Sequence, residues 1–277
     1  MTIAHATDLH PDGGIAFRHG VAMARDGAAR LCSMHANPVT DNPTAKMHDA
    51  QQLLKSWHGT DAPEIDFYKM VHTCCDDPVD ALLDAMRQIE PDLLIVGKHQ
   101  VKGFFRFLRE SVSESLALNT RVPTLFVPIG KRGFVDEASG RVQLDRLLLP
   151  VKDERSFQRS FEMANKLLKT LGKEDVEIVL LHVSDDSVSA EDAEVGGKIL
   201  LDKMVNSVSE DGLRWRRVQR QGDLADEIVD SVEEFDIDMV VMATQGHDSL
   251  GDVLGGSRTE RVIRRGSCPL LSVPLEQ

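Results

Sequence analysis

The sequence is poor in several features that would narrow its function, and cysteine is the first of them. Only four cysteines occur in 277 residues, at Cys32, Cys74, Cys75 and Cys268. Their spacing matches no zinc site, and the adjacent Cys74 and Cys75 make a poor disulfide pair. This usage predicts reduced thiols and a cytoplasmic protein.

Long apolar runs and positive charge are also scarce. No stretch approaches the roughly 20 apolar residues that cross a bilayer. The first 14 residues lack both the charged region and the apolar core of a secretory signal. With 45 acidic and 32 basic residues, the net charge is −13. This balance argues against a general nucleic-acid binder, because phosphate backbones attract basic surfaces. The short basic run at 214–220 fits a solvated strand face.

Common catalytic and phosphate-binding signatures are missing as well. The chain has no G-x-x-x-x-G-K-[ST], no G-x-G-x-x-G, no G-x-S-x-G and no H-E-x-x-H. His72, Cys74 and Cys75 are potential soft metal ligands close in sequence. On an alternating strand, however, Cys74 and Cys75 point to opposite sides, so we expect no metal site there.

An internal repeat is present. Residues 92–128 align with residues 238–274 at a constant offset of 146, without a gap. Their apolar runs coincide, and eight positions are identical: Asp92/Asp238, Leu108/Leu254, Ser111/Ser257, Glu114/Glu260, Pro123/Pro269, Leu125/Leu271, Val127/Val273 and Pro128/Pro274. The two halves of the chain are therefore predicted to be copies of one domain.

Each half alternates strand patterns with helix patterns. In the second half, apolar or alternating runs predict strands at 146–151, 176–183, 213–220, 238–243 and 269–274. Amphipathic stretches predict helices at 154–172, 190–208 and 223–235, and one that starts near Gly256. The first half repeats this order less clearly, between 2–6 and 123–128, with a single helix predicted over 45–57.

This alternation predicts an α/β fold in which a parallel sheet is covered by helices on both faces. The polar, glycine-containing stretch 130–145 is predicted to be a linker. Two domains follow, 1–129 and 146–277, each of a typical domain size.

The stretch "MATQGHDSLGDVLGGSRTERV", 242–262, leaves a predicted strand and enters a predicted helix. In an open α/β sheet, ligands bind beyond the carboxyl ends of the strands. A helix N-terminus offers N–H groups and partial positive charge to a phosphate, and glycine lets the backbone approach it. Glycines are equally typical of a plain turn, so the residues alone leave both interpretations open.

This stretch resembles the nucleotide loop of the universal stress protein family. The family pattern is Gly, two residues, Gly, nine residues, then Gly followed by Ser or Thr. Gly246, Gly256 and Ser257 match it, whereas Ala243 stands in place of the first glycine. The ending "SCPLLSVP" also resembles the last strand of the family. Because the resemblance covers both halves, the chain is similar to a tandem, two-domain member.

The resemblance implies a fold and a ligand. Each family domain is a five-stranded parallel sheet with helices on both faces. In ATP-binding members the loop holds the phosphates, and the ends of the first two strands help to hold the ribose and adenine. Carried onto this sequence, the nucleotide-binding residues are Pro150, Val151, Asp153, Val183, Met242, Ala243, Gly246, Gly256, Ser257, Arg258 and Thr259. ATP, with or without Mg²⁺, is the expected cofactor, and no residue is expected to be catalytic.

Alternatives stay open at two of these positions. The family aspartate directly follows "PV", where this chain has Lys152, and Asp153 comes one residue later. Asp153 is therefore either a ribose ligand or a helix cap. Arg258 is either a phosphate ligand or a solvated helix residue. His182 and its counterpart His35 are expected to be locally hydrogen-bonded rather than catalytic.

The first half departs further from the loop pattern. Gly97 matches the first glycine, but Gln100 replaces the second and Glu110 replaces the third. A carboxylate at the phosphate end of a helix would repel the anion. We therefore expect no ATP binding of the family type in the first half, where Asp8 has a structural role.

Three functions are compatible with the sequence. The first is a regulatory stress-response protein whose C-terminal domain binds ATP or a related adenine nucleotide. The second is an adaptor without a nucleotide, which Ala243 and Lys152 favour. The third is a slow ATPase, which ranks last because no general base or arginine finger is evident.

The resemblance also concerns assembly. In the family the last strand of each domain lies at a sheet edge and pairs between domains or subunits, and an apolar edge strand needs a partner. This implies an intramolecular pseudo-dimer and allows a homodimer. Nucleic acid and membranes are not expected partners.

Overall fold

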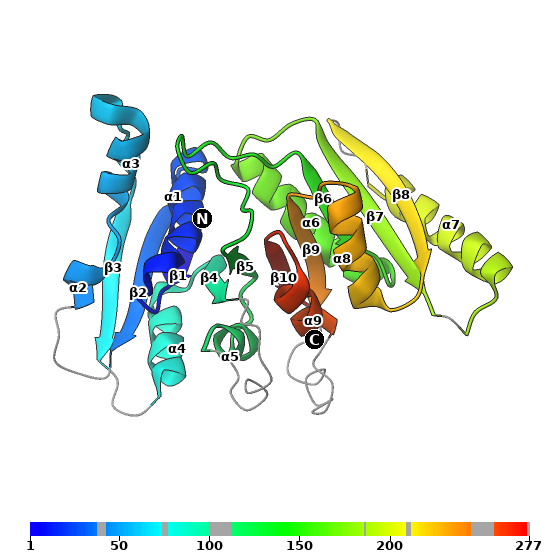
Figure 1. Ribbon diagram of the computed structural model, residues 1–277, viewed down its shortest axis with the longest axis horizontal. Coiled ribbons are helices and arrows are strands. Elements are labelled where there is room, and N and C mark those ends of the chain that lie inside the picture. The colour runs from blue at the N-terminus through cyan, green and yellow to red at the C-terminus, as the bar shows by residue number, and fades with distance from the viewer. Residues whose placement is uncertain are drawn as a thin grey trace. The chain divides into compact units, whose positions relative to one another are not determined.

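The computed structural model describes residues 1–37, 43–73, 77–99, 112–185, 187–208, 212–244 and 258–275. The chain forms two compact units, Met1–Gln143 and Leu144–Gln277. Each unit is an α/β domain built on five parallel strands, as the alternating apolar runs predict (Figure 1). Within the described ranges, no helix is long and apolar enough to cross a membrane.

The sheet of the first unit has the strand order β3-β2-β1-β4-β5. Its strands are β1 (Thr2–Ala6), β2 (Arg30–Asn37), β3 (Phe67–Thr73), β4 (Leu93–His99) and β5 (Thr124–Ile129). Its helices are α1 (Gly14–Asp26), α2 (Pro43–Lys46), α3 (Ala50–His58), α4 (Pro78–Ile89) and α5 (Val112–Asn119), with short 3₁₀ turns η1 (Pro11–Gly13) and η2 (Gly59–Asp61). Central strands such as β1 and β4 are buried on both faces because helices cover both.

The second unit repeats this order as β8-β7-β6-β9-β10. Its strands are β6 (Arg146–Pro150), β7 (Val176–Ser184), β8 (Leu213–Gln221), β9 (Met239–Thr244) and β10 (Leu270–Pro274). Its helices are α6 (Glu154–Thr170), α7 (Ala190–Asn206), α8 (Leu224–Glu234) and α9 (Arg258–Arg265). In the view of Figure 1, α8 and α9 lie in front of this sheet, and α6 and α7 lie behind it.

One predicted helix of the first unit is wrong in its extent. The pattern over 45–57 predicts a single helix, but the structure has α2, a break, and then α3. The break occurs because Asp49 adopts an extended backbone and its carboxylate accepts the N–H of Gln52, at 2.9 Å. Asp49 thereby starts a new helix instead of continuing the first.

The repeated pair Asp92 and Asp238 has the same role in both units. Each aspartate precedes the fourth strand of its unit and reaches the start of the first. Asp92 Oδ2 accepts the N–H of Thr2 at 2.8 Å. Asp238, only 5% exposed, accepts the N–H groups of Asp145 and Arg146 at 2.8 and 2.9 Å. The carboxylate thus ties the amino ends of two neighbouring strands, which accounts for the identity of the two positions.

Replacing Asp238 with asparagine should lower the free energy of unfolding of the second unit by about 1–2 kcal/mol, because the bonds lose their charge assistance. Asp92→Asn is the matched control. Its hydrogen bond is exposed to water, so we expect less than about 1 kcal/mol. Urea unfolding followed by Trp215 fluorescence in a Trp57→Phe background measures the loss for Asp238→Asn. Trp57 fluorescence in a Trp215→Phe background measures the loss for Asp92→Asn. Equal losses for the two variants would contradict this account.

The segment predicted to be a linker packs on the first unit as far as Gln143. Phe134 and Val142 are almost fully buried. The Trp57 indole N–H donates to the carbonyl of Glu137 at 3.0 Å. Gly140 has a φ of +68°, and a Cβ there would lie 2.3 Å from the Trp57 ring, so this position requires glycine.

Candidate functional site

The connections of the second unit change face at the carboxyl edge of its sheet, between β6 and β9. Strands β6 and β9 are neighbours, but β6 continues through α6 behind the sheet and β9 leads to α9 in front of it (Figure 1). Ligands bind at such a switch point in open α/β sheets. Pro150 and Val151 lie at the end of β6, and Met242 and Ala243 lie near the end of β9.

Asp153 is the N-cap of α6. Its Oδ1 accepts the N–H of Ser156 at 2.8 Å, and the Ser156 hydroxyl lies 3.2 Å from the N–H of Asp153, which completes a capping box. The helix-cap alternative therefore describes an observed contact. Asp153 is exposed, as is Lys152 beside it. Only one of the two carboxylate oxygens, Oδ1, makes the cap.

His182 lies at the end of β7 and fixes the turn after β6. Its Nδ1 donates to the carbonyl of Val151 at 3.0 Å, since a carbonyl can only accept. The N–H of Val151 donates to the carbonyl of Leu181 at 2.8 Å, so both backbone groups of Val151 are occupied. The expectation of a locally hydrogen-bonded histidine is thus confirmed for His182.

The first unit contains the same device. His35 Nδ1 lies 2.8 Å from the carbonyl of Thr7, which follows β1 as Val151 follows β6. Asp8 accepts the N–H of His10 at 2.9 Å and therefore shapes the same turn. The repeat thus uses a histidine on the second strand to hold the loop after the first, in both units.

Val183, one residue after His182, is half-buried and pairs with Arg220 of β8. The ring of His182 also packs under α7, because a Cβ on Gly197 would lie 2.9 Å from His182 Cδ2 and 2.8 Å from Gln219 Nε2. Gly197 therefore lets α7 approach the ends of β7 and β8 closely.

Near the end of β9, Met242 is buried and Ala243 is half-buried. The hydroxyl of Thr259, in the first turn of α9, lies 3.9 Å from the Met242 sulfur. Arg258 is the first residue of α9. Gly246, Gly256 and Ser257 lie outside the described residues, as do Gln100 and Glu110 of the first half and Cys74 and Cys75.

Helix α9 is anchored to α8 by an ion-pair cluster that the sequence analysis missed. Arg261 donates to Asp223 at 2.7 Å and to Asp226 at 3.2 Å, and Arg265 also pairs with Asp226. The hydrogen bond from Arg261 lowers the pKa of Asp223 and raises the pKa of Arg261. The sequence shows that the two arginines are four residues apart and the two aspartates three apart, so each pair lies on one helix face. It does not show that the arginines of one helix bind the aspartates of the other.

This cluster also decides what Arg261 can do. Its guanidinium is engaged with two carboxylates, one of which is the N-cap of α8. An arginine neutralised in this way is a poor phosphate ligand, because binding would first break charge-assisted bonds. Arg261 therefore holds α9 in position beside the carboxyl edge.

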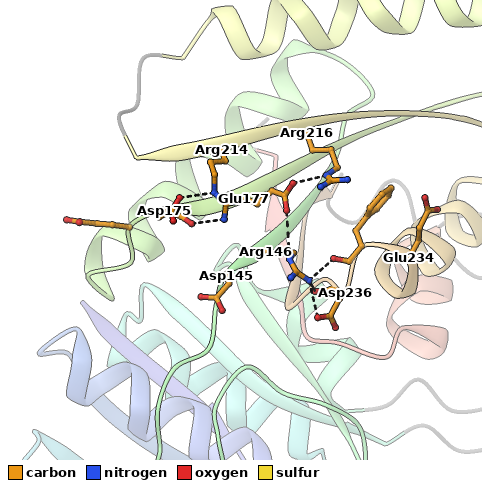
Figure 2. Close-up of a pocket in the computed structure, with 10 residues that line it drawn as sticks. Asp145, Arg146, Asp175, Glu177, Arg214, Arg216, Glu234 and Asp236 are labelled. Carbon is orange, nitrogen blue, oxygen red and sulfur yellow. Dashed lines mark hydrogen bonds and ion pairs between the residues drawn. The ribbon is translucent and has the colours of Figure 1, made fainter.

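A hollow of about 580 Å³ lies at the opposite, amino edge of the same sheet. It is lined by ten residues: Asp145, Arg146, Glu174, Asp175, Glu177, Arg214, Arg216, Glu234, Phe235 and Asp236. Figure 2 shows each arginine turned to a carboxylate: Arg214 to Asp175 at 2.8 Å, Arg216 to Glu177 at 2.7 Å and Arg146 to Asp236 at 3.0 Å.

The charges of this hollow exclude it as a phosphate site. Six of its side chains are acidic and three are basic, so its lining is net negative. It also lies at the end of the strands where α/β sheets do not bind their ligands. Among the residues that the structure describes, no group of three or more His, Cys, Asp or Glu side chains is arranged to hold a metal.

Comparison with known proteins identifies the family. The sequence pattern of the universal stress protein family matches residues 1–128 and 144–274. The chain belongs to the universal stress protein family. Its two matched segments correspond to the two structural units, so it is a tandem universal stress protein, as the repeat predicts.

Single-domain relatives align with about half of this tandem universal stress protein or less. A universal stress protein of Synechocystis is 25% identical over 150 residues, which covers 52% of this chain and 94% of that protein. One from Methanothermobacter thermautotrophicus is 31% identical over 123 residues, covering 39% and 84%. A solved universal stress protein from Archaeoglobus fulgidus covers 100% of this chain and 97% of its own, with a TM-score of 0.66 and 18% identity. That likeness concerns the fold alone.

Proposed function

We propose that the second unit of this universal stress protein binds an adenine nucleotide, ATP foremost, at the carboxyl edge of its sheet. One observation carries the proposal. Residues 245–257, which hold Gly246, Gly256 and Ser257 at the family spacing, connect Thr244 at the end of β9 with Arg258 at the start of α9. That connection leaves the sheet at its switch point, beside an anchored helix N-terminus.

The proposed contacts follow from this placement. The phosphates would bind N–H groups of the loop and of the first turn of α9, including Arg258 and Thr259. The ribose would bind the carboxylate oxygen of Asp153 that is not engaged in the cap. The base would lie against the backbone of Val183, beside His182 and the turn that it holds. Mg²⁺, where present, would accompany the phosphates.

The proposed role is regulatory and cytoplasmic. Binding would change the conformation or partner choice of the protein, which requires different nucleotide affinities in two states. The first unit would not bind in this manner, because Glu110 occupies the position equivalent to Gly256. The strands β5 and β10 are last in the strand order of their own units, which supports the proposal of a pseudo-dimer through these edges.

An adaptor without a nucleotide is the second candidate. Ala243 breaks the glycine pattern, and Asp153 already serves as a helix cap. A slow ATPase remains third, since the described part of the edge holds no evident general base for water attack on a γ-phosphate.

The deciding experiment analyses the protein as purified for bound nucleotide and then titrates it calorimetrically with ATP, with and without Mg²⁺, and with AMP. We expect binding of at least one of these nucleotides and no phosphate release over hours. An empty protein that binds none at millimolar concentration would favour the adaptor. Steady release of phosphate, lost on removal of the protein, would favour the ATPase.

A further inference from the structure

The outer face of α7 is the most apolar exposed helix surface among the described residues. Four large apolar side chains are exposed in the described part of the chain, and three belong to α7 or the turn before it: Val188 at 38%, Val195 at 56% and Ile199 at 64%. Val195 and Ile199 are four residues apart, so they lie one turn apart on the same face. The opposite face of α7 packs on β7 and β8 through Gly197.

Gly196 adds a second observation on the exposed side. A glycine in the middle of a helix weakens it relative to alanine, so it normally has a packing reason. The neighbouring Gly197 has one in the contact with His182. A Cβ on Gly196 would meet no atom of this chain within 4 Å. The chain itself therefore gives no reason for Gly196, whereas close approach of another backbone would.

The charges of α7 are arranged in two halves about this apolar pair. Glu191, Asp192 and Glu194 lie on its N-terminal side, and Lys198 and Lys203 lie at or beyond its centre toward the C-terminus, together with Asp202, whose charge Arg217 balances. A helix with an acidic half and a basic half is complementary to itself when a second copy runs antiparallel. The antiparallel orientation also sets the opposite ends of the two helix dipoles side by side.

We infer that α7 is a docking surface for the α7 of a second copy of this chain, related by a two-fold axis at the level of Gly197. With a rise of roughly 1.5 Å per residue, Val195 then faces Ile199 of the other copy at the same height. Asp192 lies within roughly 1.5 Å in height of Lys203 of the copy, and Glu194 within roughly 3 Å of its Lys198.

Two remaining acidic side chains of the face oppose each other across the axis. Asp202 lies level with Asp192 of the copy and within roughly 1.5 Å in height of its Glu191, although it already pairs with Arg217 of its own chain at 2.9 Å. Lys203 pairs with Glu154 at 2.6 Å in an exposed position, so it can share a second carboxylate. One helix pair buries less area than a standard interface, so the association is expected to be reversible and of micromolar strength.

Sedimentation of the full chain over a range of concentrations tests the inference. We expect reversible self-association that the exposed substitutions Val195→Ser and Ile199→Ser weaken at least tenfold, while the circular dichroism spectrum stays unchanged. Gly196→Ala should raise the thermal unfolding midpoint of the dilute protein and yet weaken association. A stabilising substitution that weakens pairing distinguishes close approach from a fold defect.

A charge exchange is the sharper test. Glu194→Lys and Lys198→Glu should each weaken self-association, because the like charges then face one another. An equimolar mixture of these two variants should associate at least as well as the original chain. A chain that stays monomeric up to several hundred micromolar overturns the inference, as does association that all these variants retain. A mixture that fails to recover also overturns it.

Discussion

Lowering the pH from 6.5 to 5 is expected to destabilise the first unit by about 2 kcal/mol for each of two buried histidines, His5 and His19. Burial lowers the pKa of His5 to about 3, and the neighbouring His48 adds to this effect. Burial likewise lowers the pKa of His19 to about 4. Both values lie well below the 6.5 of an exposed histidine.

The geometry of His19 explains why its neutral form is held. Its Nδ1 donates to the carbonyl of Ile15 at 2.7 Å, and its Nε2 accepts the N–H of Phe134 at 3.0 Å. Protonation would add a hydrogen to Nε2, so that two N–H donors, one on His19 and one on Phe134, would face each other. Phe134 belongs to the packed segment 130–143. Gly133 closes the site further, because a Cβ there would lie 2.3 Å from the ring.

The direction of the effect follows from linkage. A folded-state pKa below the unfolded value means that the unfolded chain takes up the proton first, as the pH falls below about 6.5. Stability is fully present above that pH and is lost progressively until the folded-state pKa values, about 4 and about 3, are reached. An aspartate whose pKa is lowered on folding, such as Asp136, changes the stability only when the pH falls toward its unfolded-state pKa of 3.8. The window from pH 6.5 to pH 5 therefore isolates the effect of the histidines.

Each unit has its own tryptophan, Trp57 in the first and Trp215 in the second. Tryptophan fluorescence during urea unfolding at several pH values therefore reports on the first unit in a Trp215→Phe background and on the second in a Trp57→Phe background. His5→Asn and His19→Gln should each reduce the pH slope of the first unit by nearly one proton, whatever their cost at pH 7. The second unit is the control, since none of its described histidines is buried. A first unit equally stable at pH 6.5 and pH 5 would contradict the assignment.

The repeat and the helix faces made the fold predictable from the sequence. Apolar periodicity located β1, β6 and β7 to within a residue at each end, because burial on a regular element leaves a regular pattern. The repeat also located Asp92 and Asp238, although not what they bind. The bond from Asp238 to Arg146 joins residues 92 apart, and such contacts leave no periodic trace.

Composition predicted the linker at 130–145 but not how the segment packs. Its charges and glycines are typical of a linker, but the apolar residues Phe134 and Val142 bury themselves against the first unit. Phe134 packs on His19, and the carbonyl of Glu137 accepts the Trp57 indole N–H, so the partners of this segment lie far away in the sequence. The same limit applies to the candidate site. Spacing suggested the loop, whereas the capping box of Asp153 and the anchoring of α9 required coordinates.

Replacing Gly256 with glutamate is expected to weaken nucleotide binding by at least roughly a hundredfold, since a carboxylate about 5 Å from a phosphate charge repels it by roughly 3 kcal/mol at an effective dielectric constant of 20. The substitution copies Glu110, which stands at the equivalent position of the first half. Because Gly256 lies just before α9, the added charge would also sit at the end of the helix that favours anions.

The matched control is Asn206→Glu, which adds the same charge at an exposed residue at the far end of α7. This control should bind ATP as the original chain does, so a loss confined to Gly256→Glu reports on the loop and not on net charge. Calorimetric titration measures both variants, and urea unfolding of the second unit checks that each remains folded. Unchanged affinity in a folded Gly256→Glu variant would show that the phosphates bind elsewhere. The proposed site at the carboxyl edge would then have to be abandoned, even if the protein binds ATP.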